Sequence, residues 1–272
     1  MAIEDIIQRT GDQPMTGERI VRDLHALGVQ PGMTLLVHAS LSSLGWVCGG
    51  AQAVVLALEA ALGEEGTLVM PAHSSDWTDP ANWANPPVPP AWWPVIREHW
   101  PAYDPDLTPT RRMGAIAETF RRQRGTCRSA HPAVSFVARG PHAEHITGSH
   151  ALDFGFGDDS PLARVYELDG HVLLLGVDHS RNTSLHLAEY RAEFPGKRYY
   201  ECGSPVSVDG QRTWRPCQDV ESRTDDFPAI GDAFAEATGL VQRHKVGLAE
   251  ALLVPQRALV DFATTWMQEH RQ

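Results

Sequence analysis

Unbroken apolar runs of strand length recur along the chain, and each of them ends in a polar loop. Residues 33–38, the run that ends at Met70 and Pro71, and residues 172–177 are the clearest examples. A short apolar run of this kind fits a strand that is buried on both faces of a parallel sheet. The carboxyl ends of parallel strands lie at one edge of such a sheet, so we expect the polar loops that follow to meet there.

Segments with helical periodicity separate these runs. Thr16 is a capping residue, and Ile20, Leu24 and Leu27 follow at helical spacing until Gly28. Further helices are predicted at 51–62, 93–99, 113–124, 160–168, 258–268 and just after residue 182. Strands that alternate with helices predict a three-layer α/β/α fold around a central, mostly parallel sheet.

Two regions depart from this alternation. The segment from about 76 to 109 is rich in proline and tryptophan and predicts an irregular flap. After Arg191, apolar and polar residues alternate on both sides of Asp209–Gly210, which predicts an antiparallel hairpin. We assign the hairpin and the acidic stretch behind it to about 199–227. No linker divides the chain, so residues 1–272 are expected to form a single domain.

Composition narrows the class of protein. The chain has 272 residues, a net charge of -11 and thirteen histidines. Nucleic-acid binders usually carry a basic stripe, so this charge argues against nucleic acid and leaves room for a cationic partner. An acidic surface that serves only solubility is the alternative. No stretch approaches eighteen consecutive apolar residues, and we expect a soluble, cytoplasmic protein that does not contact a membrane.

The cysteines give no sign of a structural site. Cys48, Cys127, Cys202 and Cys217 are scattered and include no C-x-x-C pair. This spacing indicates neither a zinc ribbon nor a disulfide framework. The four residues are therefore expected to be reduced thiols.

The helix start after residue 182 carries the sharpest chemical signal. Thr183, His186 and Glu189 recur at three-residue spacing, so their side chains share one helix face, with Tyr190 as an alternative last member. A neutral imidazole can take a proton, a carboxylate can orient it, and a hydroxyl can donate to a developing oxyanion. A solvated helix face with no catalytic role remains open on spacing alone.

Other polar groups follow the predicted strands. The small-residue loop after residue 38, with Ser40, Ser43 and Gly45, lets backbone amides approach a ligand, although a plain turn fits the same pattern. Residues 73–76 and 128–131 place further polar side chains beside strands, and Asp219 and Glu221 begin an acidic cluster after the hairpin. That cluster is either a solvated rim or a wall for a cationic ligand.

Taken in order, six motifs resemble one known family. They are "LVHASLSSLGWVCGGA", "GTLVMPAHS", "RSAHPAVSF", "SPLARVYELDGHVLLLGV", "NTSLHLAEYR" and "VGLAEALL". Together they resemble the aminoglycoside N3-acetyltransferases of the antibiotic N-acetyltransferase family, which differ in fold from the GNAT acetyltransferases. The resemblance runs from about Thr16 to the carboxyl terminus. It implies acetyl transfer from acetyl-CoA to the 3-amino group of the 2-deoxystreptamine ring, which inactivates the antibiotic.

The resemblance also implies roles for particular residues. His186 matches the family's general base and Thr183 the hydroxyl before it, whereas the assignment of Glu189 as the orienting carboxylate rests on spacing. Carboxylates are expected to hold the drug's ammonium groups, with Asp219 and Glu221 as first candidates and Asp76 and Asp153 as further ones. The expected coenzyme A contacts are His38, Ala39, Ser40, Ser43, Leu44, Gly45, Ser129, Val134 and Phe136.

Three other functions stay open. The acceptor could be an amine other than an aminoglycoside, or the chain could bind its ligands without catalysis. A metal hydrolase is conceivable because His73, Asp76, Asp178, His179 and His186 could all lie at strand ends. No H-E-x-x-H or other compact ligand pair supports it, and we expect no metal. The sequence leaves the oligomeric state open between monomer and homodimer.

Overall fold

The predicted buried strands are neighbours at the centre of one sheet. In the computed structural model, which describes residues 2–272, β1 (Thr34–Ala39) pairs in parallel with both β2 (Thr67–Pro71) and β5 (His171–Leu175). Across these residues the sheet has seven strands in the order β3-β4-β2-β1-β5-β9-β8. The central position of the three parallel strands explains why their sequences are continuously apolar.

Antiparallel strands extend the sheet on both sides. They are β3 (Cys127–Arg128), β4 (Phe136–Arg139), β8 (Gln242–Val246) and β9 (Ala249–Pro255). Among the described residues, β4 and β9 run antiparallel to the central strands. β3 pairs antiparallel with β4, and β8 pairs antiparallel with β9, so β3 and β8 run in the same direction as the central strands. Five of the seven strands therefore share one direction, which confirms the mostly parallel sheet.

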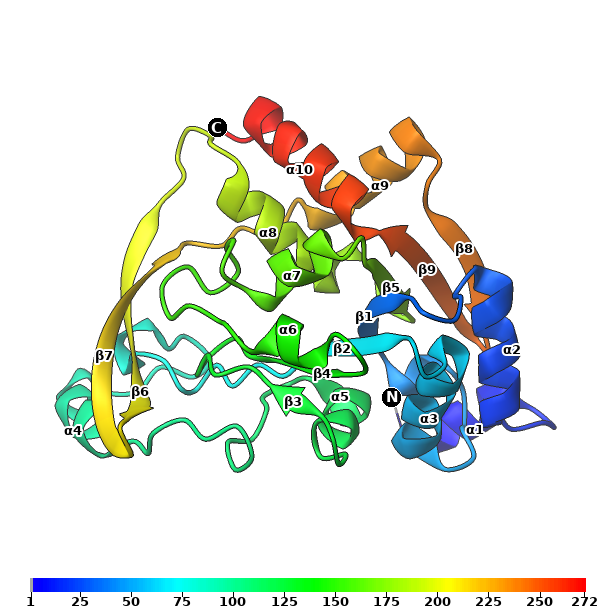
Figure 1. Cartoon of the computed structure of the whole chain (residues 1–272), viewed down its shortest axis with the longest axis horizontal. Helices are drawn as coiled ribbons and strands as arrows, with labels where there is room; N and C mark the ends of the chain where they lie inside the picture. Colours follow the sequence, from blue (N-terminus) through cyan, green and yellow to red (C-terminus); the bar gives the residue numbers. More distant parts are fainter. Residues whose placement is uncertain (1) are drawn as a thin grey trace.

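Helices cover both faces of the sheet and give the predicted three layers (Figure 1). The first layer consists of α2 (Gly17–Leu27), α3 (Gly50–Leu62) and α5 (Gly114–Arg121). The opposite layer consists of α6 (Ala143–Thr147), α7 (Pro161–Glu167), α8 (Ser184–Arg191), α9 (Phe227–Thr238) and α10 (Gln256–His270). A short amino-terminal helix, α1 (Ile3–Thr10), precedes them. As the sequence predicts, the Thr16 hydroxyl caps α2 by accepting from the amide of Arg19.

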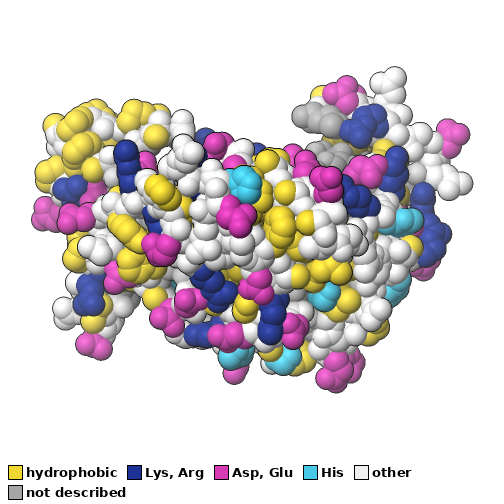
Figure 2. All heavy atoms as spheres, turned by 90° about the horizontal axis from the view of Figure 1, so that it is seen from above, with side chains coloured by type: hydrophobic (Ala, Val, Ile, Leu, Met, Phe, Trp, Pro, Cys, Tyr) yellow, Lys and Arg dark blue, Asp and Glu magenta, His cyan; other side chains and the backbone are white. Residues whose placement is uncertain are grey.

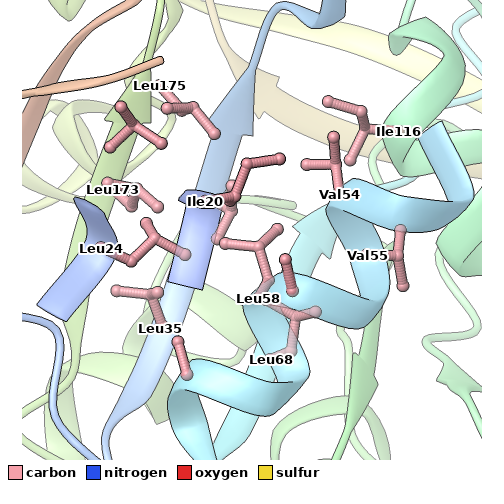
Figure 3. Close-up of a cluster of buried hydrophobic side chains, with 14 of the residues drawn as sticks. Ile20, Leu24, Leu35, Val54, Val55, Leu58, Leu68, Ile116, Leu173 and Leu175 are labelled. Carbon is pink, nitrogen blue, oxygen red and sulfur yellow. The ribbon is translucent and has the colours of Figure 1, made fainter. Parts of the chain in front are cut away.

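Alternation along the strands divides the core into two clusters. Leu35 and Leu173 point to the layer of α2 and α3, whereas Leu36 and Val172 point to the other layer. Figure 3 shows the first cluster, in which Ile20 and other side chains of α2 and α3 meet the strand side chains. Each fully buried side chain of this size contributes about 1.5–3 kcal/mol to folding. Because the two clusters pack on both faces of the central strands, they fix the positions of the strand ends that the polar loops follow.

The hairpin and the flap lie beyond one end of the sheet (Figure 1). The hairpin consists of β6 (Tyr199–Val208) and β7 (Gln211–Val220), and both turn residues have positive φ as a type I′ turn requires. The flap contains the short helix α4 (Trp93–His99). The flap packs on the hairpin, since the amide of Tyr103 donates to Pro205 O at 2.9 Å and the hydroxyl of Ser204 donates to Trp77 O at 2.7 Å.

The expectation of reduced thiols is wrong for two cysteines. Cys202 on β6 and Cys217 on β7 are direct partners across the hairpin and form a disulfide. They are fifteen positions apart in the sequence, so the pairing depends on hairpin register and not on a short motif. Cys48 and Cys127 are free, as expected. No helix within residues 2–272 has the length and apolar character needed to cross a membrane.

Candidate active site

A cleft of about 1030 Å³ opens at the carboxyl edge of the central strands. Its walls are the loop after β1, the end of β2, the start of α5, and the loop that leads from β5 into α8. The lining includes residues 37–42, 45–47, 70–71, 112–117 and 180–183, with His73, Val134, Phe156, His186 and Phe227. The polar loops after the three apolar runs therefore meet at one edge, as predicted.

His186 and Glu189 form a hydrogen-bonded pair in the wall of this cleft. Nδ1 of His186 lies 3.1 Å from Oε2 of Glu189, and the imidazole is 13% exposed. The ring stacks on Phe156 with centroids 4.6 Å apart and contacts the ring of Phe227 edge-on at 5.0 Å. Because the carboxylate takes Nδ1–H, the neutral ring keeps the lone pair on Nε2. His186 can therefore accept a proton at Nε2.

Glu189 is fully buried, which excludes the solvated helix face for this residue. Its Oε1 accepts from Nη1 of Arg271 and from the amide of Arg223, both at 2.7 Å. Burial alone would raise the pKa of Glu189, but hydrogen bonds from His186, Arg223 and Arg271 together with the charge of His186 lower it. Glu189 is thus ionised at neutral pH. Arg271 lies 82 residues away along the chain, and no local motif marks it.

Thr183 lines the cleft beside His186 but bonds to a different histidine. Its hydroxyl lies 3.2 Å from Nε2 of His38, at the end of β1, and its amide lies 3.4 Å from the same nitrogen. Burial, with a smaller contribution from the charge of His186, lowers the pKa of His38 to about 3. His38 is therefore neutral. Thr183 and His186 share the cleft wall, as their spacing predicted, without a hydrogen bond between their side chains.

The loop after β1 divides into lining and supporting residues. Ala39, Ser40 and Gly45 line the cleft. Ser43 lies beneath them, and its hydroxyl donates to Ser40 Oγ at 3.0 Å and to the carbonyl of Gly176 at 3.1 Å. Leu44 is completely buried in the core. Of the expected coenzyme contacts in this loop, Ser43 and Leu44 therefore support the loop and do not face the cleft.

Gly45 has a backbone conformation that suits glycine. Its φ is +91°, and a Cβ there would lie 3.0 Å from Oγ1 of Thr10 and 3.1 Å from Cδ1 of Leu248. Glycine at this position keeps the loop close to α1. The loop backbone can consequently approach a ligand as the small-residue pattern predicted.

The segment from Ser129 to the start of β4 places only one of its three expected contacts in the cleft. Val134 lines the cleft. Ser129 is fully buried, where its hydroxyl accepts from the amide of Phe136 at 2.9 Å and lies 2.9 Å from Nδ1 of His150. Phe136 belongs to the core. Ser129 and Phe136 therefore shape the wall from behind.

Two of the four candidate carboxylates line a second hollow of about 580 Å³, between the flap and the hairpin. Val134 and Arg112 line both this hollow and the cleft, so the two are adjacent. Asp219 accepts a hydrogen bond from the hydroxyl of Tyr190, and burial raises the pKa of Asp219. Asp76 forms an ion pair with Arg111.

The other two carboxylates lie outside this hollow. Asp153 is exposed, and its Oδ1 accepts from the amide of Gln218 at 2.8 Å. Glu221 is exposed on the chain that leaves β7. Neither residue lines the cleft or the second hollow. We therefore retain Asp219 and Asp76 as the carboxylates that a ligand could contact.

The cleft and the second hollow differ in charge. The cleft lining contains two arginines, Arg112 and Arg181, and no aspartate or glutamate. Within residues 2–272 neither guanidinium forms an ion pair, and Arg112 has a φ of +59°. Elsewhere charges are mixed: Figure 2 shows acidic and basic side chains interspersed over one face. Sequence reasoning missed both arginines, although each lies next to a predicted helix start.

The residues considered for a metal site do not converge. Among the described residues, no three His, Cys, Asp or Glu side chains are grouped so that they could hold one ion. His186 is paired with Glu189, and His179 packs against the backbone of Gly231. His73 lines the cleft between the rings of Phe136 and Phe156, and burial lowers its pKa to about 3.

The sequence matches a known family over most of its length. A family model described as aminoglycoside 3-N-acetyltransferase matches residues 36–268. The chain is 47% identical to the aminoglycoside N(3′)-acetyltransferase-like protein YokD of Bacillus subtilis, covering 93% of this chain and 92% of that protein. It is 44% identical to aminoglycoside N(3)-acetyltransferase VIII of Streptomyces fradiae, covering 97% and 96%.

Solved structures agree with these matches. The structure of YokD superposes with a TM-score of 0.94 at 46% identity and covers 98% of both chains. The complex of AAC-IIIb with CoASH has a TM-score of 0.84 at 33% identity, covering 94% of this chain and 97% of that one. AAC-VIa bound to sisomicin has a TM-score of 0.85 at 30% identity, covering 94% and 98%.

Proposed function

The chain belongs to the aminoglycoside 3-N-acetyltransferase family, and from this premise we propose that it acetylates the 3-amino group of the 2-deoxystreptamine ring of aminoglycosides. We propose acetyl-CoA as the donor and His186 as the general base. The observation that carries this proposal is the His186–Glu189 pair, which opens on a cleft whose lining holds two arginines, beside a hollow that Asp76 and Asp219 line together with Arg111 and Arg112.

The proposed reaction uses Nε2 of His186. The neutral acceptor amine attacks the thioester carbonyl, a C–N bond forms, and His186 takes the proton that the amine loses. The C–S bond then breaks, and the thiolate leaves as coenzyme A after it regains a proton. Glu189 stabilises the imidazolium that forms in between, because an opposite charge at hydrogen-bond distance favours the protonated ring.

The donor side of the proposal follows from the cleft. Coenzyme A carries several phosphate charges on a long, flexible arm, and Arg112 and Arg181 are the charged groups placed to meet them. The loop of Ala39, Ser40 and Gly45 would lie along the arm, with its backbone close to the ligand. Thr183 lies where a hydroxyl could donate to the thioester oxygen. The reported CoASH complex of AAC-IIIb supports this choice of donor.

The acceptor side follows from the second hollow. Asp219 and Asp76 line it together with Tyr200, Trp83 and Trp100. An aminoglycoside carries several ammonium groups, which can bind to carboxylates and to aromatic faces. The reported sisomicin complex of AAC-VIa supports this class of acceptor. Because the hollow adjoins the cleft at Val134 and Arg112, an amine there could reach the donor thioester.

A thiol-release assay tests the proposal directly. The purified chain is mixed with acetyl-CoA and a panel of aminoglycosides and other amines, and free coenzyme A and the acetylated product are measured. We expect thiol release only with amines that carry the 3-amino group, and acetylation at that nitrogen by NMR. Thiol release only with unrelated amines would show that the acceptor is not an aminoglycoside. Binding of acetyl-CoA or of an amine without thiol release would show that the chain binds its ligands without catalysis. Activity that a chelator abolishes would favour the metal hydrolase.

The arginines in the cleft lining predict a change in the KM for acetyl-CoA that can be measured separately from the KM for the drug. Arg112→Ala and Arg181→Ala are each expected to raise the KM for acetyl-CoA about 3–10-fold, and Arg181→Ala, which lies outside the second hollow, should leave the KM for the drug unchanged. The effect is modest because both guanidinium groups are exposed and screened by solvent. It should shrink at high salt and vanish with a short acetyl thioester that lacks phosphates. Arg122→Ala, on an exposed arginine just after α5, serves as the control. Equal KM values in all variants would place the phosphates elsewhere.

A further inference from the structure

Resting on the proposed role of His186, we propose that Arg271, the penultimate residue, is a positioning residue for acetyl transfer that acts through Glu189. Nη1 of Arg271 donates to Oε1 of Glu189 at 2.7 Å, and both side chains are at most 1% exposed. Oε2 of the same carboxylate faces His186. Arg271 thus contacts Glu189, which orients the proposed base, and does not itself contact His186.

The guanidinium is held rigidly from the opposite side. Its Nε and Nη2 donate to the two carboxylate oxygens of Asp226 at 2.7 and 2.8 Å, and Nη2 also donates to Arg223 O at 2.8 Å. It lies 5.1 Å over the ring of Phe194. A planar group with this many fixed contacts cannot turn without breaking several hydrogen bonds. Nη1 therefore presents its proton to Glu189 in a set direction.

This arrangement assigns a separate task to each oxygen of Glu189. Oε1 accepts two hydrogen bonds, from Arg271 and from the amide of Arg223, and has no further role. Oε2 is left for His186. A carboxylate held at one oxygen cannot rotate to share the other, so Nδ1–H of His186 keeps Oε2 as its carboxylate partner, with Ser222 Oγ farther away at 3.4 Å, and Nε2 keeps one direction. Arg271 thereby fixes the tautomer and the aim of the base.

The charges in the network are balanced so that Glu189 remains a useful anion. The titratable and charged groups that face Glu189 are His186 and Tyr190 on α8, Asp226 before α9 and Arg271 after α10. Asp226 and Glu189 share the single guanidinium, so one negative charge is left over. That charge is available to the imidazolium when His186 takes the acceptor's proton. Without Arg271, Glu189 would lose one of the hydrogen bonds that lower its pKa against the effect of burial, beside those from His186 and Arg223.

The position of Arg271 makes it open to a clean test. It follows the last residue of α10, and its amide donates to Met267 O, so the side chain can be changed without altering a helix interior. Arg191 on α8 offers a control, because it forms a guanidinium–carboxylate pair with Asp158, more exposed than that of Arg271, and does not contact Glu189. Arg271→Ala, Arg271→Lys and Arg191→Ala are made in the full chain.

We expect Arg271→Ala to lower kcat by about 10–100-fold, as a small misplacement of a catalytic group does, with both KM values within about 3-fold of wild type. Arg271→Lys should recover only part of kcat, because an ammonium keeps the charge but lacks the planar fork. Added guanidinium ion at concentrations that do not unfold the protein should raise kcat of Arg271→Ala and leave wild type unchanged. Arg191→Ala should retain kcat and respond to no addition.

The pH profile supplies a second readout that a structural role would not change. In Arg271→Ala, Glu189 loses one of the hydrogen bonds that lower its pKa, so that pKa rises and the protonated form persists to somewhat higher pH. The acid limb of the kcat profile should therefore move to higher pH, and part of the lost activity should return on the alkaline side. If kcat and the melting temperature both fall but the pH profile of kcat does not shift, Arg271 has a structural role only.

An NMR measurement separates this inference from the proposed function. Long-range ¹H–¹⁵N spectra report which nitrogen of His186 holds the proton, and they need no substrate. We expect the Nδ1–H tautomer in wild type and a mixture in Arg271→Ala. If wild type acetylates no amine, the proposed function fails while the spectra still test the positioning role. If His186→Ala is inactive but Arg271→Ala retains full kcat and the wild-type tautomer, the inference about Arg271 is wrong and the general base stands.

Discussion

His186→Ala is expected to lower kcat by about 10²–10⁴-fold, the range for loss of a general base, while the KM for acetyl-CoA stays near that of wild type. The reason is geometric. Nδ1 of His186 is held by Glu189, the ring is clamped between Phe156 and Phe227, and Nε2 is the atom left to take a proton from the acceptor. Alanine removes the proton acceptor and leaves the loop after β1 untouched.

The measurement is steady-state kinetics with both substrates varied, paired with a folding control. Removing the imidazole leaves Oε2 of the buried Glu189 short of a partner, which costs about 1–3 kcal/mol. The melting temperature of His186→Ala should therefore fall, and activity is compared where both proteins are folded. His186→Gln, which keeps an N–H at the end of the side chain, should lose kcat with less loss of stability. His244→Ala, on the exposed strand β8, is the matched control.

Near-normal turnover of His186→Ala would contradict the assignment and leave another histidine as the base. His73 lines the same cleft, and His131 lines the second hollow. Burial lowers the pKa of His73 to about 3 and that of His131 to about 4, so both are neutral at pH 7. Neither has a carboxylate at hydrogen-bond distance of the kind that His186 has. For this reason we expect their alanine variants to keep more kcat than His186→Ala.

The fold could be predicted where one local pattern decided it. Continuous apolar runs gave the three central strands, and the Asp209–Gly210 turn gave the hairpin. Boundaries were less exact: the helix expected at 113–124 is α5, Gly114–Arg121. The disulfide was missed since it depends on which residues face each other across the hairpin, and that register is not visible in cysteine spacing.

Contacts in the site could be predicted where the residues that make them are close together in the sequence. His186 and Glu189 are three residues apart on one helix, and their contact follows from that spacing. Arg271 comes from the far end of the chain and has no motif that marks it. The loop after β1 lies at the cleft as the pattern predicted, but spacing could not tell Ser40 in the lining from Ser43 beneath it. Which residue faces a cleft depends on packing between distant elements.

Asp219→Asn is expected to raise the KM for the aminoglycoside about 10–150-fold and leave the KM for acetyl-CoA unchanged. A charge-assisted hydrogen bond in a partly closed site contributes about 1.5–3 kcal/mol, which corresponds to this range. Asp219 lines the hollow between hairpin and flap, whereas Asp76 there is already paired with Arg111. The amide of asparagine can still accept from Tyr190, so the variant removes the charge and preserves the hydrogen bond.

Controls for this prediction use the other carboxylates, salt and pH. Glu221→Gln, on an exposed residue outside the hollow, should change the drug KM little. Wild-type drug affinity should weaken as salt rises, because screening acts over about 8 Å at physiological ionic strength. Burial raises the pKa of Asp219, so the charge is present above that pKa, and affinity is lost as pH falls through it. If Asp219→Asn, higher salt and lower pH all leave the drug KM unchanged, this hollow does not recognise the ammonium groups. The acceptor would then have to enter from the side of the cleft lined by Arg112 and Arg181.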